Sequence, residues 1–165
     1  MAGIKELFTL LQKIKDNPVI YIDKPSITCL DSFLTGYIDG LITLGFTDIK
    51  SCGMEGFQEW IQERAKTNLT LSWAGIILFR SGSERAAFNS FFELFEQFLK
   101  QKNASKIQEN EDILRLRQDL MFPRFDIYKE ILGAIKKRPG MYLGASPITE
   151  LDMLLRGYIG IIFDF

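Results

Sequence analysis

The sequence predicts an all-α protein, a single domain over residues 1–165 with around seven helices. Apolar residues recur at three- and four-residue steps along most of the chain, which is the spacing of amphipathic helices. No region alternates strand, helix and strand, and no Asn-Gly hairpin signal occurs. One alternative stays open. The run from Trp73 to Phe79 lacks any polar alternation, so it is either helical or a buried strand.

The two ends of the chain carry related sequences. A shift of 142 − 21 = 121 residues aligns 135–161 with 14–40 without a gap. Twelve of these 27 positions are identical, and in the first copy they are Ile14, Lys15, Pro18, Tyr21, Ile27, Thr28, Leu30, Asp31, Leu34, Gly36, Tyr37 and Ile38. We therefore predict an internal repeat of two helix–loop–helix units, over about 4–44 and 126–163, that enclose central helices over 54–122. The two units are expected to sit side by side about a pseudo-twofold axis.

The first unit is predicted to begin with an amphipathic helix over 4–15 that ends before Pro18, because the residue before a proline disfavours the helical conformation. An extended stretch over 19–22 follows. The next helix, over about 28–44, is predicted to begin at a Thr28 cap with Asp31 bonding back, and to end at Gly45.

A glycine inside that second helix predicts a close helix crossing. Gly36 costs about 1 kcal/mol of helix stability relative to alanine, and it recurs as Gly157 in the second unit. A residue that weakens its own helix and yet recurs indicates that another backbone approaches there.

The central region contains the longest predicted helix, over 83–102, with a capping box formed by Ser81 and Glu84. Its wide phenylalanine face is expected to be core, although a ligand pocket between the rings is an alternative. Shorter helices are predicted over 54–66, from Leu71 onward, and over 113–122 before Pro123. The second unit then adds helices over 126–137 and 149–163.

Composition argues against several classes of function. The net charge of −1 gives no overall field for nucleic acid or an anionic membrane. The chain has no histidine, so a serine or cysteine nucleophile lacks its usual base. Cys29 and Cys52 are too few for a zinc site and are expected to be reduced thiols in a cytoplasmic protein. We expect no enzymatic activity, no metal and no cofactor.

A basic segment joins the two helices of the second unit. Lys136 to Gly144 resembles a short segment of the ATPase subunit of DNA gyrase, but the glycine-rich nucleotide motifs of that ATPase do not occur in this chain. We interpret the segment as a turn between helices, anchored by Tyr142 as Tyr21 anchors the first copy. The basic residues at 136–138 suit the negative end of the helix dipole, and phosphate binding is the alternative.

A broader resemblance covers about half of the chain. It includes the Pro-x-x-Tyr loop, the Ile-Thr-x-Leu-Asp helix that ends in Gly-Tyr, the segment GFQEWIQERA, and the segment from Ser72 to Leu99. This order is similar to that of small helical immunity proteins from bacterial contact-dependent growth inhibition and other polymorphic toxin systems.

The resemblance implies an inhibitor that forms a one-to-one complex with a cognate toxin domain, often a nuclease, and blocks its active site. Because a nuclease cleft is usually basic, we expect a locally acidic binding surface. The candidate partner-binding residues are Asp16, Asp23, Asp48, Glu109, Glu111, Asp112, Tyr21 and Tyr142. The alternative is a structural or adaptor module that acts as a homodimer or binds a helical peptide.

Overall fold

The computed structural model describes residues 2–43, 53–67, 70–103, 124–143 and 147–163. Within these ranges it contains nine helices and no strand. They are α1 (Ala2–Asp16), α2 (Pro18–Ile22), α3 (Ile27–Thr43), α4 (Phe57–Ala65), α5 (Trp73–Ser81), α6 (Glu84–Asn103), α8 (Arg124–Lys137), α9 (Pro139–Tyr142) and α10 (Pro147–Phe163). The all-α prediction is confirmed for this part of the chain, and Trp73–Phe79 is helical. The predicted helix over 113–122 and the Gly45 cap lie outside the described residues.

Two short helices account for part of the difference from the predicted seven. The stretch over 19–22 was predicted to be extended, but it belongs to α2, and α9 occupies the predicted turn after Arg138. Each short helix begins with a proline, whose fixed φ suits the first helical position although it ends the preceding helix. The prolines therefore break one helix and start the next.

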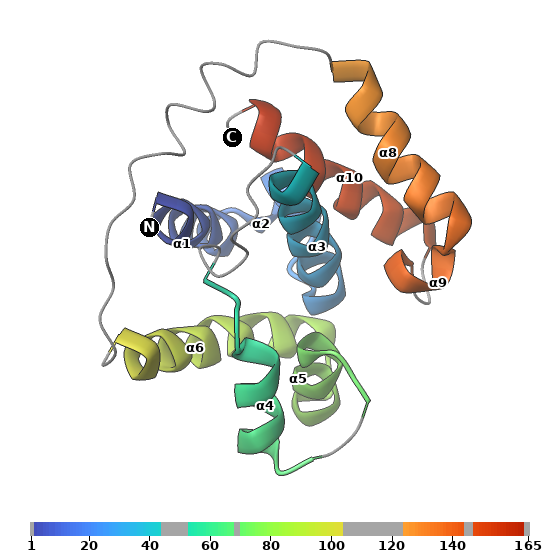
Figure 1. The fold of residues 1–165 in the computed structure, drawn as a ribbon. Helices are drawn as coiled ribbons and strands as arrows, with labels where there is room; N and C mark the ends of the chain where they lie inside the picture. Colours follow the sequence, from blue (N-terminus) through green and yellow to red (C-terminus); the bar gives the residue numbers. More distant parts are fainter. Residues whose placement is uncertain (1, 44–52, 68–69, 104–123, 144–146, 164–165) are drawn as a thin grey trace.

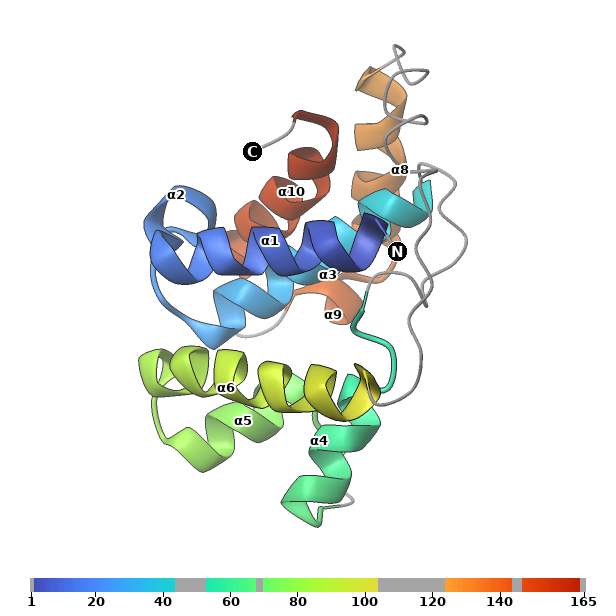
Figure 2. The same ribbon diagram turned by 90° about the vertical axis from the view of Figure 1, so that its left-hand side faces the viewer.

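The helices form two layers (Figures 1 and 2). In one layer α3 and α10 cross, with α1 and α2 beside α3 and with α8 and α9 beside α10. The other layer contains α4, α5 and α6, and it contacts the first mainly through α5 and α6 against α3. Segments from the two ends of the chain therefore pack together.

The α3–α10 crossing brings two backbones into direct contact at Gly36 and Gly157. A Cβ atom added to Gly36 would lie 2.7 Å from the carbonyl carbon of Leu154, and one added to Gly157 would lie 2.8 Å from that of Phe33. Both separations are shorter than real Cβ contacts, so only glycine permits this approach. The predicted close crossing is confirmed.

Phenylalanine rings fill the space between the three helices of the second layer. The buried Phe57 of α4 has ring centroids 5.3 to 5.8 Å from those of Phe91, Phe95 and Phe98 of α6 and from Trp73 of α5. Rings at such separations and tilts attract by about 0.5–1.5 kcal/mol per pair beyond the burial of their surface. The predicted phenylalanine face of α6 is therefore core, as expected.

The start of α3 is capped differently from the prediction. Ser26, not Thr28, is the N-cap residue, because its Oγ accepts the amide of Cys29 at 3.2 Å. Thr28 lies inside the helix and bonds to Glu84 of α6, where its hydroxyl donates to Oε1 at 2.7 Å and its amide to Oε2 at 3.1 Å. The Ser26 hydroxyl also donates to Oε2, at 2.7 Å.

The predicted capping box of α6 is also wrong. Ser81 is the last residue of α5, and Ser83 caps α6 by accepting the amide of Ala86 at 3.3 Å. Glu84 therefore does not take part in a capping box of α6, and it caps the start of α3 instead. A local pattern could not reveal this, since the residues that Glu84 binds lie more than fifty positions away.

Candidate functional site

Four exposed apolar side chains lie on the two short helices and at the start of α10. Val19 and Ile20 of α2 are 65% and 62% exposed, Met141 of α9 is 68% exposed, and Ile148 of α10 is 84% exposed. Apolar side chains of this exposure add nothing to the core. Val19 and Ile20 lie on α2, well apart from α9 in both views (Figures 1 and 2), whereas α9 contacts α10, which carries Ile148. We define Met141 and Ile148, on the contacting helices α9 and α10, as the tip surface.

The two predicted tyrosines each end one of these short helices. Tyr21 is buried in the main core, whereas Tyr142 is half-buried and packs against the smaller cluster that Ile131, Leu154 and Tyr158 help to form. They differ in part because α2 contacts α10 as well as α1 and α3. Tyr142 therefore has more surface to offer a partner than Tyr21.

Two of the predicted acidic residues lie at the ends of α2. Asp16 is the last residue of α1 and Asp23 is the C-cap of α2, and both are exposed. Lys15 and Lys24 adjoin them in the chain and are also exposed, so charge of both signs surrounds α2. The other candidate acids, Asp48, Glu109, Glu111 and Asp112, lie outside the described residues.

The basic residues of the second unit end α8. Lys136 and Lys137 occupy its last turn, Arg138 is the N-cap residue of α9, and all three are exposed. This position suits the negative end of the α8 dipole, as the sequence predicted. Three exposed cations therefore precede Met141 in the chain, the last of them Arg138 at the start of α9.

A pair of carboxyl groups lies where α3, α10 and α5 meet. Burial of Asp31, together with the charge of Glu150, raises the pKa of Asp31 to about 7, against a hydrogen bond from Ser72 that lowers it. Glu150 itself is buried. Sequence reasoning missed this pair because it assigned Asp31 to a helix cap, and no local pattern connects Asp31 to Glu150.

The Asp31 carboxyl group predicts a distinct pH dependence of stability. A raised pKa means that the folded protein keeps the proton while the unfolded chain, near pKa 3.8, releases it. The stabilisation that the protonated Asp31 contributes is present below about pH 4 and is lost as the pH rises toward 7. We expect Asp31→Asn to abolish this loss and to raise the melting temperature by several degrees at pH 8 but little at pH 4.

Thermal unfolding followed by circular dichroism between pH 4 and 8 tests this prediction. Asp152→Asn is the matched control, because Asp152 is the aligned residue of the second unit, is exposed, and pairs with Arg156 at 3.0 Å. An exposed pair of this kind contributes little. Parallel pH profiles for the wild type and Asp31→Asn would contradict the assignment.

A groove of about 360 Å³ lies on the α4–α5–α6 layer. Arg64 and Arg80 line it with Ser90, Glu93 and Gln97. Both guanidinium groups already have contacts, since that of Arg64 lies over the Trp60 ring and that of Arg80 donates to the Ala65 carbonyl at 3.5 Å. These contacts leave the two guanidinium groups only partly available to a ligand in the groove.

Two further features concern chemistry and location. Among the described residues, no group of three His, Cys, Asp or Glu side chains could hold a metal ion. Cys29 is a buried free thiol, and Cys52 lies outside the described residues. In the same part of the chain no helix has the length and apolar character needed to cross a membrane.

Comparison of the chain with protein-family models, with curated proteins and with solved structures finds no match.

Proposed function

We propose that this protein acts by contact as an immunity protein, which binds a cognate bacterial toxin domain and blocks its active site. The observation that carries the proposal is the tip surface, where Met141 and Ile148 are 68% and 84% exposed on a helical framework. Apolar anchors of this kind dominate the energy of many protein interfaces. The resemblance of the sequence to helical immunity proteins suggests the class of partner, a toxin domain that is often a nuclease.

We also propose that the framework consists of two repeated units, α1–α2–α3 and α8–α9–α10. Matching backbone geometry supports this. The residue before each proline has φ −137° and ψ 69° at Asn17, and φ −141° and ψ 63° at Arg138, 121 positions later. Its amide donates to the carbonyl four residues earlier, at 2.9 Å to Lys13 and 3.0 Å to Ala134.

The helix crossing supports the same repeat. Gly36 packs on Leu154, and Gly157 packs on Phe33. The shift of 121 residues takes Gly36 to Gly157 and Phe33 to Leu154, so each contact is the image of the other. A pseudo-twofold axis through the crossing would produce this reciprocity.

Co-expression with the toxin encoded beside this gene tests the proposed function. We expect the wild type to rescue growth and to co-purify with the toxin domain in a one-to-one complex. Met141→Glu and Ile148→Glu should weaken the complex by about 10-fold or more, because each places a charge within the apolar contact. Phe79→Glu is the control, since Phe79 is 78% exposed on α5, away from the tip surface. Absence of both rescue and binding would refute the proposal.

The same exposed residues favour a second candidate, an adaptor that pairs with its own copy. Light scattering would then give twice the mass of the chain without any toxin, and Met141→Glu would restore the monomer. A monomer at all concentrations would reject this candidate.

A further inference from the structure

The two proposed units differ in what covers them. In the first unit Leu11 of α1 and Ile27 of α3 are 1% and 0% exposed. Their counterparts 121 residues later, Leu132 of α8 and Ile148 of α10, are 44% and 84% exposed. By contrast, the aligned Phe33 and Leu154 at the helix crossing are both fully buried. The residues at the helix crossing are therefore buried in both units. The units differ in the exposure of the face that α6 approaches in the first unit.

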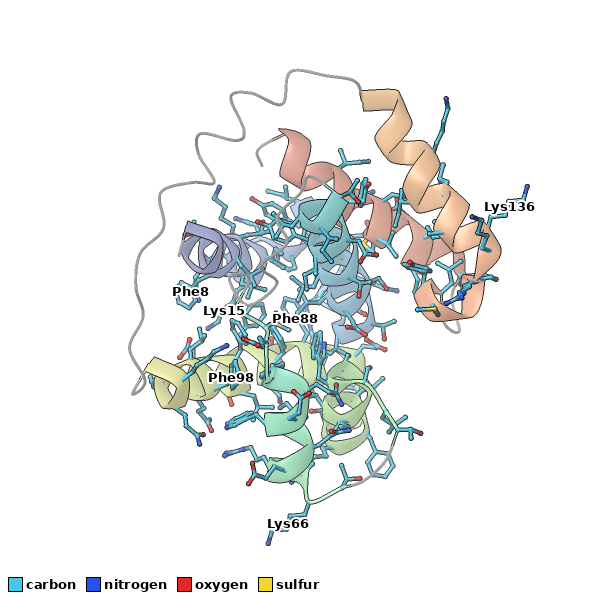
Figure 3. The ribbon with its side chains drawn as sticks, viewed as in Figure 1. Phe8, Lys15, Lys66, Phe88, Phe98 and Lys136 are labelled. Atoms are coloured by element: carbon cyan, nitrogen blue, oxygen red, sulfur yellow. The ribbon has the colours of Figure 1, made fainter. Side chains whose placement is uncertain are left out.

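Helix α6 is tied to the first unit at two places. Glu84 accepts hydrogen bonds from Ser26 and Thr28 at the start of α3. Lys15 of α1 lies 3.8 Å from a carboxylate oxygen of Glu96, with its ammonium 5.5 Å from the centroid of the Phe92 ring. Figure 3 shows Lys15 in the space between α1 and α6, near Phe88.

These contacts follow one stripe of α6. Glu84, Phe88, Phe92 and Glu96 are spaced four residues apart, so they lie along one side of the helix. A different side carries Phe91, Phe95 and Phe98, whose rings contact Phe57 of α4. The first unit is therefore covered by a carboxylate, two aromatic rings and a second carboxylate, in that order.

The second unit retains most of the groups that bind this stripe. Lys136 is the counterpart of Lys15, and Thr149 is the counterpart of Thr28, with the amide of Ile148 beside it. Pro147 replaces Ser26, so one hydroxyl donor is lost. Lys136 is exposed and extends away from the rest of the molecule (Figure 3), and Lys137 and Arg138 add positive charge.

We infer that the exposed face of the second unit, formed by Leu132, Lys136, Ile148 and Thr149, is a docking site for a helix of a partner protein. That helix presents a carboxylate in its first turn, aromatic residues four and eight positions later, and an acidic residue twelve positions later. The first carboxylate binds at Thr149, the rings cover Leu132 and Ile148, and the last acid pairs with Lys136. The inference rests on the proposed repeat and contact function, and it names the chemistry of the partner.

A peptide derived from α6 tests the inference without any toxin. Residues 83–102 are synthesised with Phe91→Ala, Phe95→Ala and Phe98→Ala, which removes the face that contacts Phe57 but keeps the four-residue stripe. A lactam between Asn89→Lys and Glu93, both exposed positions in α6, keeps the peptide helical. Fluorescence anisotropy then measures its binding to the full chain.

We expect saturable binding that weakens at least 10-fold with Ile148→Glu and with Lys136→Glu. Phe79→Glu should leave it unchanged, because Phe79 is exposed on α5, outside this face. A peptide with Glu96→Lys should recover affinity for the Lys136→Glu protein. Recovery of affinity in this charge exchange would identify position 96 of the peptide and position 136 of the protein as a contacting pair.

Three results would overturn the inference: no binding of the helical peptide, equal weakening by Phe79→Glu, or no recovery in the charge exchange. A chain that dimerises until Ile148→Glu is introduced would assign the face to a second copy instead. If the peptide binds but the protein does not rescue cells from the toxin, the docking site is supported and the proposed immunity function is rejected. The failure of one proposal can therefore be distinguished from the failure of the other.

Discussion

Gly36→Ala should destabilise the protein by roughly 3 kcal/mol or more, an unusually large effect for the addition of one methyl group. The new Cβ would lie 2.7 Å from the carbonyl carbon of Leu154. Because the obstacle is backbone, no side chain can rotate away, and α3 and α10 must separate along their whole contact. Gly157→Ala should have a comparable effect, since its Cβ would meet the Phe33 carbonyl group.

Urea unfolding followed by circular dichroism measures both effects. Gly133→Ala is the matched control, because Gly133 lies inside α8 and a Cβ there meets nothing within 4 Å. Alanine favours a helix over glycine by about 1 kcal/mol, so this variant should be slightly more stable than the wild type. If Gly36→Ala and Gly133→Ala have the same free energy of unfolding, the close crossing is refuted.

Glu84→Gln should cost roughly 2 kcal/mol or more, because the carboxylate accepts bonds from Ser26 and Thr28 at the start of α3. An amide of the same size can accept at only one of its two ends. It also loses the favourable interaction of a negative charge with the helix start. The substitution should thus loosen the connection between the two layers.

The pH dependence of this loss has a defined sign. Burial alone would raise the pKa of Glu84, but the hydrogen bonds from Ser26, Thr28 and Ile27 outweigh it and lower the pKa below the usual 4.5. The stabilisation is present above that value and is lost as the pH falls through the lowered pKa of the folded state. The difference between the wild type and Glu84→Gln should therefore shrink in acid.

Urea titrations at pH 3 and pH 7 measure the contribution of Glu84. Glu93→Gln is the control on the same helix, since Glu93 is exposed. It should change stability by less than about 0.5 kcal/mol at either pH. Equal losses for the two variants would show that Glu84 is an ordinary surface acid.

The periodicity of apolar residues was sufficient to predict the helical class and the phenylalanine core of α6. It also predicted the close crossing, because a glycine inside an amphipathic pattern has a recognisable cost. The ends of helices were less predictable. Thr28, Ser81 and Glu84 matched local capping patterns, yet Glu84 bonds across the fold to α3. Tertiary contacts override such patterns whenever a better donor lies nearby.

The candidate site was only partly predictable for the same reason. The sequence singled out Tyr21 and Tyr142 because they recur, and it placed Asp16 and Asp23 beside the loop. It could not show that Ile20 and Met141 are exposed, because large apolar residues are usually buried. The pairing of Asp31 with Glu150 required α3 and α10 to meet, which only the fold reveals.

The α3–α10 crossing also sets the order in which the molecule can assemble. The segments that meet at Gly36 and Gly157 are separated by 121 residues of chain, so a very long loop must close before either backbone gains its neighbour. Contacts this distant in sequence slow folding. On the ribosome α3 must wait until α10 has emerged, and until then the surface around Phe33 that α10 later covers is open to chaperones and to misassembly.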